Sequence, residues 1–141
     1  MIFFFDTSAL IKRYVDEKGS KRVDEFFENA SRIFVSSITK VESFSALRRL
    51  HSEKLITQKE YLLLKKEITL DFSFFDVTPL TKEIESLAIS LVEKHQLKTL
   101  DSIQLASFIF QKETIEQFIV SDTKLCIAAK NEQLNYINPL D

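Results

Sequence analysis

The sequence predicts an α/β fold in which a central parallel sheet of about five strands is covered by helices on both faces. Short apolar runs rich in Phe, Ile and Val recur along the chain, and each is too short for a helix. These runs are almost continuously apolar, as in strands that are buried on both faces, and longer segments with helical spacing separate them. With 141 residues, 45% of them hydrophobic, the chain has the size and composition of one domain over residues 1–141.

The expected strands lie at residues 2–5, 33–35, 74–77, 118–120 and 136–137. Side chains that cap helices mark three helix starts: Asp6, Ser20, and Thr57 with Glu60 as a capping box. Residues 38–54 and 57–70 show helical spacing with no strand between them. We therefore expect a helical hairpin beside the sheet.

Composition excludes several classes of function. Gly19 is the only glycine, so the chain forms neither a P-loop nor a dinucleotide-binding turn. Cys126 is the only cysteine, which excludes internal disulfides and cysteine-rich zinc sites and favours the cytoplasm. No signal peptide or membrane-spanning run is recognisable, so we expect a soluble, intracellular protein. The formal charge of −2 means that nucleic-acid contacts would need a local basic patch or a metal ion.

The histidines and serines do not indicate catalysis. His51 and His95 lie far apart, each near the end of a predicted helix, and neither has companions at metal-ligand spacing. We expect structural roles for both. No serine has the flanking glycines of a nucleophile elbow, which makes a hydrolase triad an unfavoured hypothesis.

Four carboxylates stand in apolar surroundings. Asp6 and Asp122 each follow an apolar run, Asp101 begins a helix that is apolar nearly all round, and Glu42 lies among small residues. Burying an ionised carboxylate without a partner is costly, so a shared divalent cation is the simplest explanation. Three of these acids stand at helix starts, which an α/β sheet brings to the carboxyl edge of its strands.

Each acid also has an ordinary structural interpretation. Asp6 and Asp122 are favoured helix N-caps, worth about 1 kcal/mol each. Asp101 would complement its helix dipole, worth about 0.3–1 kcal/mol, with Thr99 as the cap. Glu42 lacks a cationic neighbour at ion-pair spacing, yet a partly exposed helix glutamate remains an alternative.

At these residues the chain resembles the PIN-domain ribonucleases and, within them, the VapC-type toxins of toxin–antitoxin pairs. The resemblance spans almost the whole chain. It rests on FFFDTSALIKRYVDEKGS at the start, then KVESFSALRRL, HQLKTLDSIQLAS, FIVSDTKLCIAAK and the closing YINPL. It implies a three-layer α/β/α sandwich. Gln104 departs from the family pattern, in which histidine is frequent, so we expect substrate contacts rather than metal ligation to differ.

The resemblance also assigns site residues. It places Asp6, Glu42, Asp101 and Asp122 at a site for one or two Mg²⁺ or Mn²⁺ ions. It implies that Thr7, Ser8 and Ser121 help to position carboxylates, metal-bound water or a phosphate. Candidate RNA contacts are cations near the acids in sequence: Lys12, Arg13, Arg48, Arg49, Lys98 and Lys124. For each cation taken singly, ordinary solvated charge is the alternative.

The implied function is a metal-dependent endoribonuclease toxin that leaves 5′-phosphate and 3′-hydroxyl ends. A VapB-like antitoxin is the expected partner, lying along the helical hairpin at 38–70 and reaching into the acidic pocket with a basic residue. The resemblance also implies a homodimer. Two other functions stay open: a PIN nuclease of RNA maturation or decay without an antitoxin, and a non-catalytic binding module with the same fold.

Overall fold

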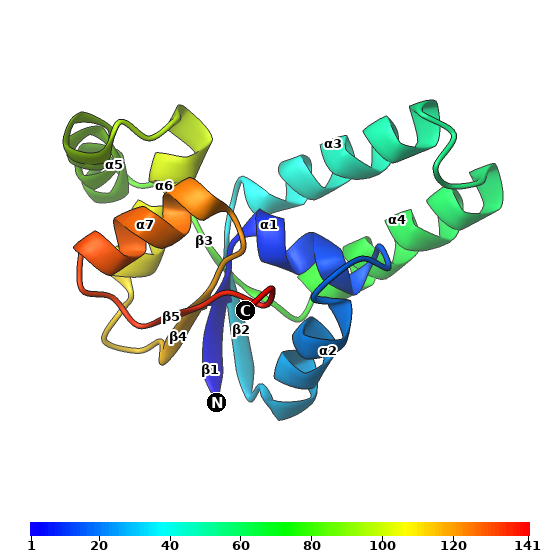
Figure 1. The fold of residues 1–141 in the computed structure, drawn as a ribbon, viewed down its shortest axis with the longest axis horizontal. Helices are drawn as coiled ribbons and strands as arrows, with labels where there is room; N and C mark the ends of the chain where they lie inside the picture. The colour runs from blue at the N-terminus through cyan, green and yellow to red at the C-terminus, as the bar shows by residue number, and fades with distance from the viewer.

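The computed structural model describes all 141 residues and confirms the α/β architecture with a five-stranded parallel sheet (Figure 1). The strands are β1 (Ile2–Phe5), β2 (Arg32–Ser36), β3 (Asp76–Thr78), β4 (Gln117–Ile119) and β5 (Tyr136–Ile137). Their order across the sheet is β3-β2-β1-β4-β5, and every neighbouring pair is parallel. In the middle strand, Phe4 pairs with Phe34 on one side and with Phe118 on the other. Asp6 therefore leaves the sheet at the centre of its carboxyl edge.

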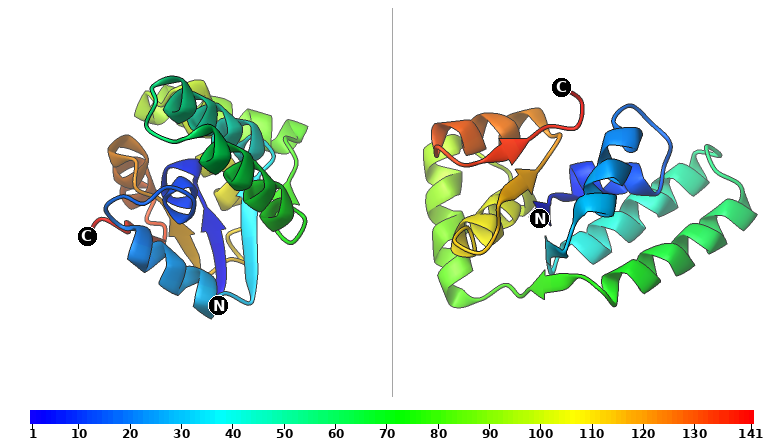
Figure 2. Two further views of the ribbon diagram at one scale, coloured as in Figure 1. Left: turned by 90° about the vertical axis from the view of Figure 1, so that its right-hand side faces the viewer. Right: turned by 90° about the horizontal axis from the view of Figure 1, so that it is seen from below.

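Helices cover both faces of the sheet. They are α1 (Thr7–Leu10), which continues as the 3-10 turn η1 (Ile11–Arg13), α2 (Ser20–Asn29), α3 (Thr39–Ser52), α4 (Gln58–Phe72), α5 (Lys82–His95), α6 (Thr99–Phe110) and α7 (Thr123–Asn131). Figures 1 and 2 show α5, α6 and α7 on one side of the sheet and α1 to α4 on the other. The pair α3 and α4 forms the predicted hairpin, and Thr57 with Glu60 forms the predicted capping box. No helix has both the length and the apolar composition that crossing a bilayer requires.

Two hydrophobic cores form because side chains alternate along β1. Phe4 faces α5, α6 and α7, where its ring packs edge-on against Phe108 and Phe118. Phe3 and Phe5 face the opposite layer, which α1 to α4 supply. All three phenylalanines are at most 2% exposed. The FFF triplet thus serves both layers, which explains why this strand is apolar throughout.

Two local predictions are wrong by one or two residues. The third strand begins at Asp76, because α4 runs on to Phe72 and the following turn leaves Phe74 78% exposed. The N-cap of α2 is Gly19, with φ of +93°, and not Ser20. The hydroxyl of Ser20 is instead bonded to the preceding turn, where it accepts the amide of Glu17.

A third local prediction, the cap of α6, is wrong by one residue, whereas both histidines lie where the sequence predicts them. Lys98, and not Thr99, is the N-cap of α6, and its side chain makes no capping bond. Both histidines lie in the last turn of a helix, as predicted: His51 stacks on Tyr61 across the hairpin, and His95 at the end of α5 is bonded to Glu132.

Candidate active site

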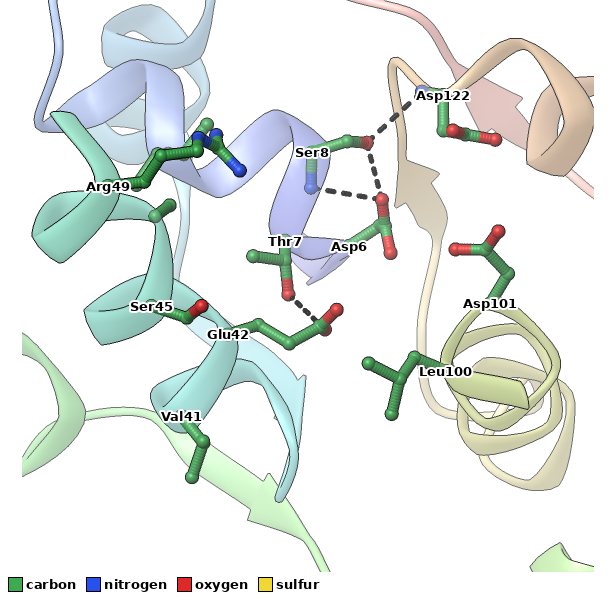
Figure 3. Close-up of a pocket in the computed structure, with 12 residues that line it drawn as sticks. Asp6, Thr7, Ser8, Val41, Glu42, Ser45, Arg49, Leu100, Asp101 and Asp122 are labelled. Atoms are coloured by element: carbon green, nitrogen blue, oxygen red, sulfur yellow. Dashed lines mark hydrogen bonds between the residues drawn. The ribbon is translucent and has the colours of Figure 1, made fainter. Parts of the chain in front are cut away.

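The four predicted carboxylates line one pocket of about 430 Å³ (Figure 3). Asp6 follows β1, Glu42 lies in α3, Asp101 in the first turn of α6, and Asp122 caps α7. Four separate elements therefore contribute one acid each. They meet because the carboxyl ends of parallel strands and the starts of the following helices lie at one edge of the sheet.

Asp6 is the most deeply buried of the four acids, at 3% exposed. Its Oδ2 caps α1 by accepting the amide of Ser8 at 3.0 Å, and the same oxygen accepts the hydroxyl of Ser8. Burial raises the pKa of Asp6 to about 7, with smaller contributions from the charges of Glu42 and Asp101 and against the lowering effect of the Ser8 bonds. Asp6 is thus both the helix cap and the buried acid that the sequence offered as alternatives.

Ser8 joins the ends of β1 and β4. Its Oγ, which donates to Asp6, accepts the backbone amides of Ser121 and Asp122 at 3.1 Å each. The hydroxyl of Ser121 donates in return to the backbone carbonyl of Ser8 at 2.9 Å. Asp122 uses Oδ1 to cap α7 through the amide of Leu125, and its Oδ2 makes no hydrogen bond within the protein. These bonds hold Asp6 and Asp122 in place at the ends of the adjacent strands β1 and β4.

Glu42 is held by side chains from other elements. Its Oε1 accepts the hydroxyl of Thr7 at 2.8 Å and the amide of Gln104 at 2.9 Å. Gln104 is 1% exposed, and its Nε2 also lies 2.9 Å from the hydroxyl of Thr39. The family resemblance implies altered substrate contacts at Gln104 and does not place this side chain against Glu42. The available signal was its position three residues after Asp101, which places both on the same face of α6.

The acids have no countercharge in contact. Burial is the largest cause of the raised pKa of Asp101. The charges of Asp122 and Glu42 raise this pKa further, while those of Lys98 and Lys124 oppose the rise. None of the four acids forms a salt bridge. No three His, Cys, Asp or Glu side chains are grouped closely enough to enclose a metal ion as they stand. The pocket is therefore open and strongly anionic.

Comparison with known families assigns the chain. Residues 3–131 match the family model of the PIN domain. The chain belongs to the PIN-domain family. A comparison with curated proteins gives no match for this PIN domain.

Solved structures share the fold of this PIN domain at low sequence identity. A toxin–antitoxin complex from Klebsiella pneumoniae has a TM-score of 0.70 at 19% identity, over 96% of each chain. FitAcB from Neisseria gonorrhoeae has a TM-score of 0.72 at 16% identity, over 99% of this chain and 98% of that one. VapC20 from Mycobacterium tuberculosis, a Sarcin-Ricin loop cleaving toxin, has a TM-score of 0.67 at 16% identity, over 89% and 94%.

Three of the six predicted RNA-binding cations lie near the acids of this PIN domain. Arg49 lines the pocket from α3, seven residues after Glu42 and so on the same face of the helix. The charges of Lys98 and Lys124 act on Asp101 from the starts of α6 and α7. All three are available to contact a substrate, since none forms a salt bridge.

The other three cations are engaged elsewhere. Lys12 is buried and its Nζ lies 2.9 Å from Glu17. Arg13 pairs with Asp71 at 3.0 Å and lies over the ring of Phe27. Arg48 contacts His51 at 3.0 Å and does not line the pocket. Packing of η1 and of the hairpin thus directs Lys12, Arg13 and Arg48 to partners other than the acids of the pocket.

Proposed function

We propose that this PIN domain is a metal-dependent endoribonuclease and the toxin of a toxin–antitoxin pair. The observation that supports this most strongly is the meeting of four unpaired carboxylates in one pocket. Their mutual repulsion contributes to the raised pKa of Asp6 and of Asp101, and a divalent cation would relieve it. The description of VapC20 as a Sarcin-Ricin loop cleaving toxin supports RNA as the substrate class.

The donors in the pocket fit Mg²⁺ or Mn²⁺. Asp6, Glu42, Asp101 and Asp122 offer carboxylate oxygens, and no histidine or cysteine lines the pocket. Mg²⁺ prefers such hard ligands and keeps several waters, so acids spread around the pocket can hold one or two ions partly through water. Bound ions of this kind supply a water of lowered pKa and neutralise charge on the phosphodiester.

Hydrogen bonding leaves oxygens free on every acid. Oδ2 of Asp6 and Oδ1 of Asp122 are used as helix caps, and Oε1 of Glu42 is held by Thr7 and Gln104. No hydrogen bond within the protein reaches Oδ1 of Asp6, Oδ2 of Asp122, Oε2 of Glu42 or either oxygen of Asp101. Thr7, Ser8 and Ser121 thus fix the acids while the remaining oxygens are available to cations and water.

The proposed reaction is hydrolysis of a phosphodiester. Oxygen of a water molecule bonds to phosphorus as the P–O3′ bond breaks, and O3′ takes up a proton, which leaves 5′-phosphate and 3′-hydroxyl ends. The free carboxylate oxygens of the pocket orient that water, and one of them accepts its proton. Arg49 supplies a charged donor for the non-bridging phosphate oxygens.

A VapB-like antitoxin is the proposed partner, and a homodimer the proposed assembly. Support comes from the shared fold with a toxin–antitoxin complex from Klebsiella pneumoniae. Leu62, Leu63 and Leu70 of α4 are each about half exposed, between 47% and 60%, which gives the hairpin apolar surface for a partner. Co-expression with the product of an adjacent small gene, followed by co-purification and light scattering, tests both proposals.

RNA cleavage by purified protein free of any antitoxin tests the function. Cleavage is expected with Mg²⁺ or Mn²⁺ and not with EDTA, and Asp101→Asn is expected to lose it. Glu93→Gln removes an exposed carboxylate of α5 outside the pocket and serves as the matched control. Full cleavage by Asp101→Asn would overturn the assignment of the active site.

A further inference from the structure

A second pocket, of about 330 Å³, lies between the end of α5 and α7. Lys94, His95 and Gln96 contribute from α5 and its C-cap, and Lys124 and Asn131 contribute from α7. No acidic side chain lines it. Its chemistry is therefore opposite to that of the active-site pocket, which four carboxylates line.

His95 is fixed in the wall of this pocket. Its side chain is 8% exposed, and its Nε2 lies 3.1 Å from Oε2 of Glu132. The same oxygen pairs with Lys94. The hydrogen bond from Lys94 lowers the pKa of Glu132, with a further contribution from His95. One ionised carboxylate behind the wall therefore orients two basic groups, and Nδ1 of His95 makes no hydrogen bond within the protein.

Lys124 connects the second pocket with the active site. It lines the second pocket, and its charge lowers the pKa of Asp101, which lies in the active-site pocket. Lys124 follows Asp122, the N-cap of α7, by two residues and has no salt-bridge partner. An RNA strand that crosses the four acids and continues along α7 therefore reaches this basic pocket.

We propose that the pocket between α5 and α7 binds a phosphate group of the RNA strand beside the bond that is cut, a step that rests on the proposed function. Lys94 and Lys124 supply charged donors, and the side-chain amide of Asn131 supplies a neutral one. Such a subsite holds the strand in register without reading its sequence. It also offsets the repulsion between the RNA backbone and the acids.

The two histidines make the test direct, because His95 lies in the pocket and His51 lies on the hairpin. A short single-stranded RNA is added to the Asp101→Asn protein with Mg²⁺, and the ring signals of both histidines are followed by NMR. Binding is expected to shift the signals of His95 and to leave those of His51 unchanged. RNA that binds without shifting the His95 signals would overturn the subsite.

Affinity provides the second measurement. Lys124→Gln and Lys94→Gln, each in the Asp101→Asn protein, are expected to weaken RNA binding by about fivefold or more, and each to reduce the slope of log affinity against log salt by about one. Lys130→Gln removes an equal charge from α7 outside the pocket and is the matched control. Equal affinities for all three variants would reject the subsite.

Measurements of RNA cleavage and of Mn²⁺ binding distinguish failure of the proposed subsite from failure of the proposed nuclease function. Mn²⁺ affinity is measured for Lys124→Gln, since its charge also acts on Asp101. Unaltered Mn²⁺ affinity with weaker RNA binding supports the subsite. Metal-dependent cleavage together with unaltered RNA binding in both lysine variants rejects the subsite and leaves the nuclease intact. A wild-type protein that neither binds nor cuts RNA rejects both.

Discussion

The side-chain amide of Gln104 donates to Oε1 of Glu42 at 2.9 Å, across 62 residues of sequence. Glu42 receives no hydrogen bond from a side chain of its own helix. Gln104 lies three residues after Asp101, so α6 supplies one acid of the pocket and positions another. The geometry of the site therefore depends on the packing of α6 against α3 and on the β1–α1 junction.

Gln104→Leu is expected to weaken Mn²⁺ binding by about 10- to 100-fold, because it removes the donor that orients Glu42. Loss of the hydrogen bonds should also lower the free energy of unfolding by about 1–3 kcal/mol. Isothermal titration with Mn²⁺ and urea unfolding measure the two effects. Gln104→His, which keeps a ring N–H donor, is the control and should bind Mn²⁺ more tightly than the leucine variant. Unchanged Mn²⁺ affinity in Gln104→Leu would contradict the positioning role.

In EDTA the protein is expected to lose stability as the pH rises from about 4 to about 7. The folded state keeps a proton on Asp6 up to a pKa of about 7, whereas an unfolded chain loses it near 3.8. Between these values the unfolded state binds fewer protons, so the contribution of Asp6 to stability falls with rising pH and is constant above pH 7.

Asp6→Asn removes this titration and keeps an oxygen that can accept the Ser8 bonds. The variant should therefore be more stable than the wild type above pH 7, by at most about 4 kcal/mol, and similar to it below pH 3.8. Urea unfolding in EDTA across this range measures the difference. Parallel pH profiles for the two proteins would show that Asp6 ionises normally in the fold.

Added Mn²⁺ is expected to raise the unfolding temperature more at pH 7.5 than at pH 5. The ion competes with protons for Asp6, so its apparent affinity grows as the carboxyl deprotonates. Scanning calorimetry measures the shift, and Asp101→Asn should reduce it while Glu93→Gln does not. A shift that is equal at both pH values would place the ion away from Asp6.

Ser8→Ala is expected to destabilise the fold by about 1–3 kcal/mol, because the amides of Ser121 and Asp122 lose their acceptor. The pKa of Asp6 should rise further, since the Ser8 side chain lowers it in the native protein. Mn²⁺ binding at neutral pH should weaken as a result. Ser86→Ala, on the exposed face of α5, is the matched control for loss of a hydroxyl.

Arg49→Gln and Lys12→Gln are expected to differ, although both were candidates for RNA contacts. Arg49 lines the active-site pocket, so its loss should lower kcat/KM by about tenfold through weaker phosphate contacts. Lys12 is buried beside Glu17, so its loss should lower stability by about 1 kcal/mol and leave kcat/KM unchanged. Comparable losses of kcat/KM in both variants would contradict the different placement of the two side chains.

Local patterns in the sequence determined the elements and the position of most acids. Apolar runs predicted the strands because burial on both faces of a parallel sheet demands continuous hydrophobicity. The caps at Asp6, Thr57 and Asp122 were predictable since each satisfies backbone amides within its own first turn. Errors arose where such signals competed, as at Ser20, whose hydroxyl bonds the preceding turn while Gly19 takes the cap position.

Only the tertiary structure decided which side chains meet. Ser8 bridges to Asp122 over 114 residues, Gln104 reaches Glu42 over 62, and Lys12 turns to Glu17 instead of the pocket. Spacing along the chain indicates whether a residue is buried or exposed, and whether it starts or ends a helix. The partner of a polar side chain depends instead on how helices pack across the sheet, because hydrogen bonds require contact within about 3 Å.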